Sequence, residues 1–91
     1  MKTIWKYPLR VTDKQEVVLP EGASILSVGL QYGRLVLWAL VDPQSPDETR
    51  TILMHGTGHP ADDAEGARFL GTIFPEDGRL AFHLFEKGGQ A

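Results

Sequence analysis

The sequence contains no cysteine, and this absence excludes a wide range of chemistry. Disulfides, thiolate zinc sites, iron–sulfur clusters and cysteine nucleophiles all require that side chain. Small secreted domains often depend on disulfides for stability. A chain of 91 residues without any is therefore expected in a reducing compartment, the cytoplasm.

Long apolar runs and basic clusters are missing as well. The longest unbroken apolar stretch, residues 35–41, is too short to span a membrane, and the opening MKTIWKYPLR has neither a signal-peptide core nor an anchor, so no membrane association is expected. Nine Lys and Arg stand against twelve Asp and Glu, which gives a net charge of −3. Without a basic face to neutralise phosphates, nucleic acid is not an expected partner.

Side-chain arrangements typical of enzymes are also scarce. The serines lie on predicted strands or in a plain loop, and none stands in a G-x-S-x-G nucleophile turn. Adjacent carboxylates occur at residues 62–63 and 76–77, in turns where acidic side chains are solvated. The sequence therefore favours a protein that is not an enzyme, and it predicts no catalytic residue and no cofactor.

Dense and evenly spaced turn signals indicate an antiparallel β protein. Pro8 removes a backbone donor, so the first strand is expected at a sheet edge. Residues 61–68 are the only candidate helix, of about two turns at most. Strands are predicted at residues 3–9, 15–19, 24–32, 35–41, 49–55, 69–74 and 80–85.

These elements predict an all-β, mainly antiparallel fold: a small β-sandwich or partly open barrel of about seven strands with at most one short helix. We expect a single globular domain over residues 1–87 and a disordered tail over residues 88–91. A hairpin turn is expected at Gly33-Arg34. The alternation in the strand before it predicts that one face carries Leu26, Val28, Leu30 and Tyr32.

Two predicted strands are apolar in both phases of the alternation: LVLWALV at residues 35–41 and AFHLF at residues 81–85. A strand buried on one face alternates polar and apolar side chains, so both of these strands are expected to be covered on both faces. The chain has almost no helix to supply a second layer. A second copy of the chain is the favoured cover, which predicts a homo-oligomer, and cover by the chain's own loops is the alternative.

The most distinctive polar motif is HGTGHP at residues 55–60. Its glycines exclude a helix, but in a loop His55 and His59 could still converge with His83 on a metal ion. The segment GTGHPA also matches the G-x-G-x-x-A pattern of nucleotide-binding loops, although acidic residues follow it and no parallel βαβ unit fits. A tight, shaped turn is the favoured interpretation.

Several segments together resemble a family of small uncharacterised proteins found in phages, prophages and their bacterial hosts. The resemblance covers almost the whole chain and implies a cytoplasmic accessory protein that acts on a host factor. It makes GTGHP part of the family pattern and leaves His55 outside it. The segments are IWKYPL (4–9), LPEGA (19–23), ILSVGLQ (25–31), LWALVD (37–42), GTGHP (56–60), FLGTI (69–73) and FHLFE (82–86).

The sequence thus predicts a non-enzymatic, self-associating binding domain whose partner is a host protein or a small ligand. The alternative is a metal- or nucleotide-binding protein, either a sponge or a small enzyme, that uses the HGTGHP loop. No metal site is predicted outright, and His55, His59 and His83 are the weaker candidates for one. The residues expected to bind the ligand or partner are Gly56, Thr57, Gly58, His59, Trp38 and His83.

Overall fold

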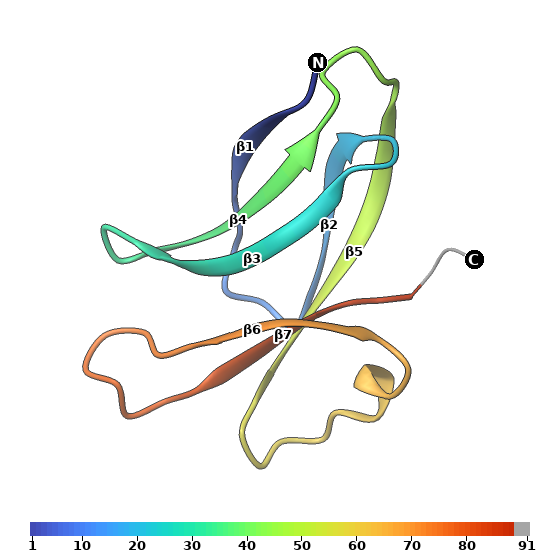
Figure 1. Ribbon diagram of the computed structural model, residues 1–91. Coiled ribbons are helices and arrows are strands. Elements are labelled where there is room, and N and C mark those ends of the chain that lie inside the picture. Colours follow the sequence, from blue (N-terminus) through green and yellow to red (C-terminus); the bar gives the residue numbers. More distant parts are fainter. Residues whose placement is uncertain (89–91) are drawn as a thin grey trace.

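The computed structural model describes residues 1–88, and it has seven strands in two antiparallel sheets (Figure 1). One sheet has the order β1–β4–β3 and the other has the order β2–β5–β7–β6. The predicted all-β, antiparallel fold is therefore confirmed. The strands are β1 (Thr3–Pro8), β2 (Lys14–Pro20), β3 (Ser24–Gln31), β4 (Arg34–Val41), β5 (Asp47–Gly56), β6 (Arg68–Ile73) and β7 (Phe82–Glu86).

The core lies between the two sheets, where alternate residues of each strand point inward. In β4 this inward set includes Leu37 and Ala39, and in β5 it includes Ile52 and Met54. Leu84 of β7 is fully buried among them. The sequence forms these strands because their inward phase is mostly apolar.

The two sheets meet along one side, where β3 runs beside β6 (Figure 1). Gly71 of β6 has φ +156°, and a Cβ on it would lie 3.0 Å from Cγ2 of Val28. This approach has room for no side chain, so glycine is required there. On the other side β1 and β2 are sheet edges, which confirms the edge position predicted from Pro8.

The candidate helix over residues 61–68 is shorter than its expected upper limit of two turns. Only a short 3₁₀ turn, η1 (Asp62–Ala64), forms there, and no side chain caps its start. A helix this short has too few internal hydrogen bonds to offset the cost of starting it. Within residues 1–88, no helix is long and apolar enough to cross a membrane.

The predicted facing of β3 also needs correction. The register with β4 shifts between Ile25 and Ser27, so Leu26 occupies a bulge. Ile25 is fully buried, Val28 packs against the core, and Leu26 is 49% exposed. A bulge inserts one extra residue into the strand, so the residues after it change places between the inward and outward faces relative to the residues before it. A simple period-two pattern in the sequence cannot reveal this change.

Residues 89–91 of the predicted tail lie outside the described residues. Gly88, the first residue of that tail, lies beside Gly66, whose carbonyl oxygen would be 3.6 Å from a Cβ at residue 88. Lys87 donates its backbone N–H to the Thr51 carbonyl at 3.0 Å. The chain therefore stays close to the four-stranded sheet as far as Gly88.

The β3–β4 turn lies one residue earlier than predicted, at Tyr32 and Gly33, and both have positive φ, +51° and +75°. Two such residues are typical of the type I′ hairpin turn, which prefers Asn-Gly. Tyr32 is 97% exposed, so its ring gains little from burial to offset the backbone strain.

Tyr32→Asn is therefore expected to raise the free energy of unfolding by about 1 kcal/mol. Urea denaturation measures the change, with Tyr32→Phe as the control because it keeps an unfavourable residue in the turn. Equal stability of the two variants would contradict the strain at Tyr32.

Candidate functional site

The HGTGHP segment leaves the end of β5 and forms a tight turn. His59 donates its backbone N–H to the Gly56 carbonyl at 3.1 Å, and Gly58 has φ +86°. The His59 ring lies against Gly56, where a Cβ would be 3.3 Å from Nδ1. A small cavity of about 180 Å³ lies beside it and is lined partly by Arg79 and Phe82.

The other two histidines fasten this loop to the outer face of the four-stranded sheet. His55 Nε2 lies 2.5 Å from Oδ1 of Asp63, which belongs to η1. His83 pairs through Nε2 with the Thr57 hydroxyl at 2.7 Å and through Nδ1 with the Thr72 hydroxyl at 2.9 Å. Both nitrogens of His83 are thus committed to the protein, and it holds Thr57 in place.

The metal alternative finds no support in this geometry. His55 and His83 are neighbours across β5 and β7. Their ring nitrogens bond to the loop and to Thr72, so they do not face a common position where a metal ion could bind. Within residues 1–88, no group of three His, Asp or Glu side chains is placed to hold a metal ion. Four protein ligands, or three and a water molecule, would be needed for zinc.

The second face of β7 is covered by the chain itself. Phe85 packs edge-on against Phe69, with ring centroids 5.5 Å apart, and lies 6.4 Å from the His55 ring. Leu53, the neighbour of Phe85 on β5, is fully buried although it lies outside the main core. The second face of AFHLF, which was expected to be covered, is therefore covered by side chains and a loop of the same chain.

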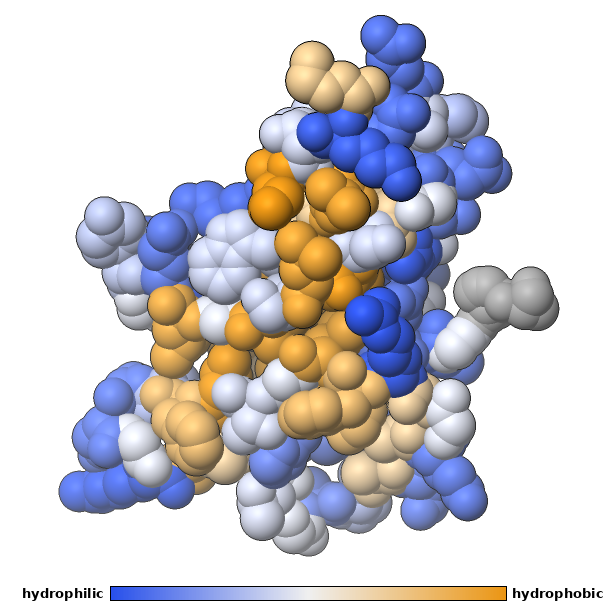
Figure 2. All heavy atoms as spheres, in the orientation of Figure 1, coloured by the Kyte–Doolittle hydropathy of each residue, from blue (hydrophilic) through white to orange (hydrophobic). Residues whose placement is uncertain are grey.

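The second face of β4 is different. Val36, Trp38 and Leu40 point away from the core, and the Trp38 ring lies across Gly29 of β3, where a Cβ would be only 3.2 Å from the ring. Ile4 of β1 is 56% exposed beside them. We call Ile4, Leu26, Val36, Trp38 and Leu40 the apolar face, in which Val36 is buried and Trp38 and Leu40 are half-buried. Figure 2 shows hydrophobic side chains gathered down the middle of one side of the molecule.

Trp38 was predicted to share one binding surface with the GTGHP loop, and this grouping needs correction. Trp38 lies on the outer face of the three-stranded sheet, whereas Thr57 and His83 lie at the outer face of the four-stranded sheet. The core separates the two sheets. Only His83 joins the loop residues Gly56, Thr57, Gly58 and His59 in one region.

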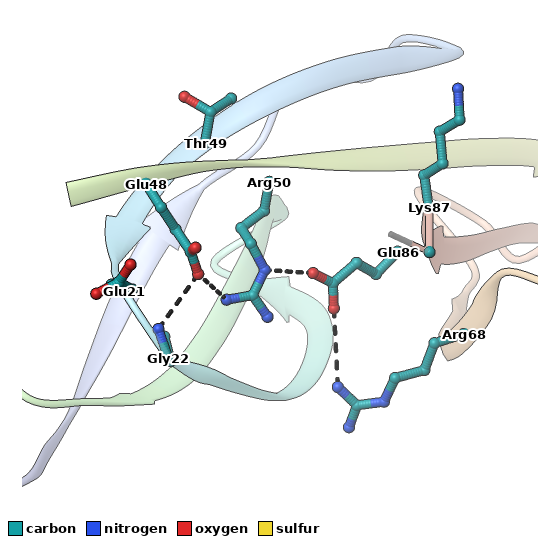
Figure 3. A pocket seen from close by; sticks show the side chains of 10 residues that line it. Glu21, Gly22, Glu48, Thr49, Arg50, Arg68, Glu86 and Lys87 are labelled. Atoms are coloured by element: carbon teal, nitrogen blue, oxygen red, sulfur yellow. Dashed lines mark hydrogen bonds and ion pairs between the residues drawn. The ribbon is translucent and has the colours of Figure 1, made fainter. Parts of the chain in front are cut away.

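A larger pocket, of about 570 Å³, opens at the end of the sandwich between the β2–β3 turn, the start of β5 and the end of β7. We call it the Arg50 pocket. Figure 3 places Glu21 and Glu48 at one end, Arg68 at the other, and Arg50 and Glu86 between them.

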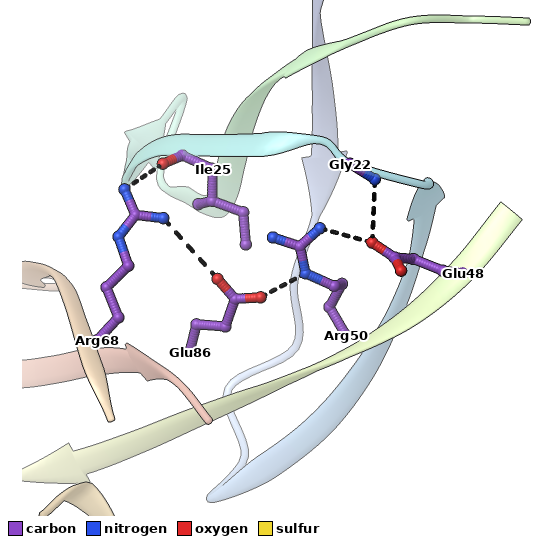
Figure 4. Close-up of polar contacts among 6 residues, drawn as sticks. All are labelled: Gly22, Ile25, Glu48, Arg50, Arg68 and Glu86. Carbon is purple, nitrogen blue, oxygen red and sulfur yellow. Dashed lines mark hydrogen bonds and ion pairs between the residues drawn. The ribbon is translucent and has the colours of Figure 1, made fainter. Parts of the chain in front are cut away.

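Four of these side chains form one connected network: Glu48, Arg50, Glu86 and Arg68 (Figure 4). The Arg50 guanidinium donates from Nε to Glu86 and from Nη1 to Glu48, the latter at 2.9 Å. Glu86 is only 8% exposed, and Arg68 approaches it at 3.8 Å. The hydrogen bond to Glu86 is the largest cause that raises the pKa of Arg50, so this side chain stays a cation.

Sequence reasoning missed this pocket, although one signal was available. Arg50 and Glu86 occupy the inward phase of β5 and β7, in line with Ile52 and Leu84. A charged residue at an inward position is costly unless it is paired. Two oppositely charged residues at inward positions of neighbouring strands predict a buried ion pair. The sequence does not reveal that β5 and β7 are neighbours.

Comparison with known proteins gives a family and nothing further. No curated protein and no solved structure matches the chain. The model of a family described as a domain of unknown function, DUF7352, matches residues 1–91. The match spans the whole sequence, and the chain therefore belongs to the DUF7352 family.

Proposed function

We propose that the protein is a non-enzymatic, self-associating binding domain and that a second copy of the chain covers the apolar face. The observation that carries the proposal is the exposure of Ile4 and Leu26 near Trp38 on the outer face of the three-stranded sheet. Burying a large aliphatic side chain that is otherwise exposed contributes about 1.5–3 kcal/mol. Exposed apolar side chains grouped on one face mark an interaction site. The same face also carries Lys6, whose Nζ donates to Oε1 of Gln31 at 2.6 Å.

A second copy fits this face better than an unrelated partner because the charges at its two ends are complementary. Arg34 begins β4, and Asp42 directly follows the strand at its other end. A two-fold axis across the strands brings Arg34 of one copy near Asp42 of the other, and it does so twice. Two sheets packed face to face in this way also bury both Trp38 rings.

The resemblance to phage and prophage proteins supports the wider role. In this proposal the assembled domain is a cytoplasmic accessory protein that acts on a host protein or a small ligand. The proposal assigns no reaction to the chain, because His83 and His55 are engaged in holding the loop and the acidic residues near them lie at the surface.

Leu26→Asp is expected to convert a dimer into a monomer, with dimer affinity weaker by about a hundredfold or more, because it places an unpaired charge in the interface. Size-exclusion chromatography with light scattering measures the mass. Val18→Asp is the matched control, since Val18 is 54% exposed on the outer face of the other sheet.

Circular dichroism verifies that both variants remain folded. The proposal requires a wild-type dimer that survives Val18→Asp and is lost in Leu26→Asp. A wild-type protein that stays monomeric, or equal behaviour of the two variants, would contradict it.

A further inference from the structure

The Arg50 pocket has the size and polarity of a small-molecule site. Its volume of about 570 Å³ falls within the usual range for ligand pockets. Its charges are separated along its length, with Glu21 and Glu48 at one end and Arg68 at the other (Figure 3). It is a different surface from the apolar face, so binding here does not depend on self-association.

Arg50 is oriented by two carboxylates but keeps free donors. Its Nε and Nη1 donate to Glu86 and Glu48. Figure 4 shows the remaining terminal nitrogen, Nη2, on the side of Ile25, with no dashed line to any residue drawn. A guanidinium has five N–H groups in one rigid plane, so the two carboxylates fix its orientation without using all of its donors.

Arg68 presents a second donor to the same space. Its Nη2 donates to the Ile25 carbonyl at 3.0 Å, and this bond holds the guanidinium over the pocket. Its Nη1 lies 3.8 Å from Oε1 of Glu86, too far for a hydrogen bond. Two guanidinium groups therefore flank Glu86, and each has donor capacity that the carboxylate does not use.

Small residues keep the pocket open around these donors. Gly22 and Ala23 form the wall opposite Arg50, and Gly88 lies two residues beyond Glu86. Gly88 lines the pocket, and a Cβ on it would make only an ordinary contact with the Gly66 carbonyl, at 3.6 Å.

We propose that the Arg50 pocket binds a small amino carboxylate. The ligand carboxylate lies beside Glu86 and accepts the N–H groups of Arg50 and Arg68 that Glu86 does not use, a charge-assisted arrangement suited to a planar anion. The ligand ammonium lies toward Glu21 and Glu48. A ligand with a single charge binds less tightly. An anion without an ammonium group is repelled by Glu86, and a cation without a carboxylate is repelled by the arginines.

The test is an NMR titration of the full chain with glycine, β-alanine and γ-aminobutyrate, with acetate and ethylammonium as single-charge probes. At least one amino acid is expected to shift the Gly22 and Gly88 amides and the Arg50 Nε–H signal, and to bind more tightly than either single-charge probe. Arg68→Gln is expected to weaken its binding by about tenfold or more, because a charge-assisted hydrogen bond is lost.

Two further variants make the result specific. Gly88→Leu fills the pocket without changing its charge and should abolish binding. Arg79→Gln is the control, since Arg79 is an exposed arginine paired with Asp77 and does not line the Arg50 pocket. The proposal is overturned if no amino acid shifts the pocket signals, if acetate binds as tightly as the amino acids, or if Gly88→Leu binds like the wild type.

Discussion

Glu86→Ala is expected to lower the free energy of unfolding by about 3 kcal/mol, because it leaves the Arg50 guanidinium largely buried and without its main acceptor. Breaking one partner of a buried ion pair typically costs about 3–5 kcal/mol. The lower end of that range applies here, since the Arg50 pocket admits water to the remaining charge.

The matched control removes both charges together. Arg50→Met combined with Glu86→Leu replaces the pair with apolar side chains of similar size. It is expected to be within about 1 kcal/mol of the wild type, because no unpaired buried charge remains. Urea denaturation of all three proteins gives the comparison. If Glu86→Ala were no less stable than the double variant, the network would not be the tightly paired cluster described above.

Gly71→Ala is expected to cost about 2–4 kcal/mol, from backbone strain and from crowding at the seam between the sheets. With φ +156°, the position disfavours any residue with a Cβ, and that Cβ would press on Val28 at 3.0 Å. Both effects act where β3 meets β6, so this substitution tests how the two sheets are joined.

Two controls separate the causes. Gly88→Ala adds a Cβ that would make only an ordinary contact, 3.6 Å from the Gly66 carbonyl oxygen, and it is expected to change stability by less than about 0.5 kcal/mol. In a Val28→Ala background the crowding disappears and only the strain remains, so Gly71→Ala should cost less there. A loss at Gly71 no larger than the loss at Gly88 would contradict the close contact of β3 and β6.

The strands could be predicted from the sequence because alternation and turn residues act locally. Pro8 indicated an edge strand, as the structure confirms. The bulge at Leu26 could not be predicted, since it depends on how β3 fits against β4 and β6. The 3₁₀ turn at residues 62–64 shows how weakly a short helical pattern constrains the backbone.

The functional regions depended on strand order, which the sequence does not encode in any local pattern. HGTGHP was identifiable as a turn from the sequence. The pairing of His55 with Asp63 and of His83 with Thr57 could not be predicted without knowing that β5 and β7 are adjacent. The Arg50–Glu86 pair spans 36 residues of sequence and forms only because β5 and β7 are adjacent. In contrast, the doubly apolar pattern of LVLWALV predicted a surface that needs cover.

The measurement that tests the central claim most directly is an isotope-filtered NOE experiment on a mixture of labelled and unlabelled wild-type protein. Self-association through the apolar face predicts intermolecular NOEs from the Trp38 indole protons of one copy to the Ile4 and Leu26 methyl groups of another. The absence of intermolecular NOEs at millimolar protein concentration, or NOEs confined to the outer face of the β2–β5–β7–β6 sheet, would contradict it.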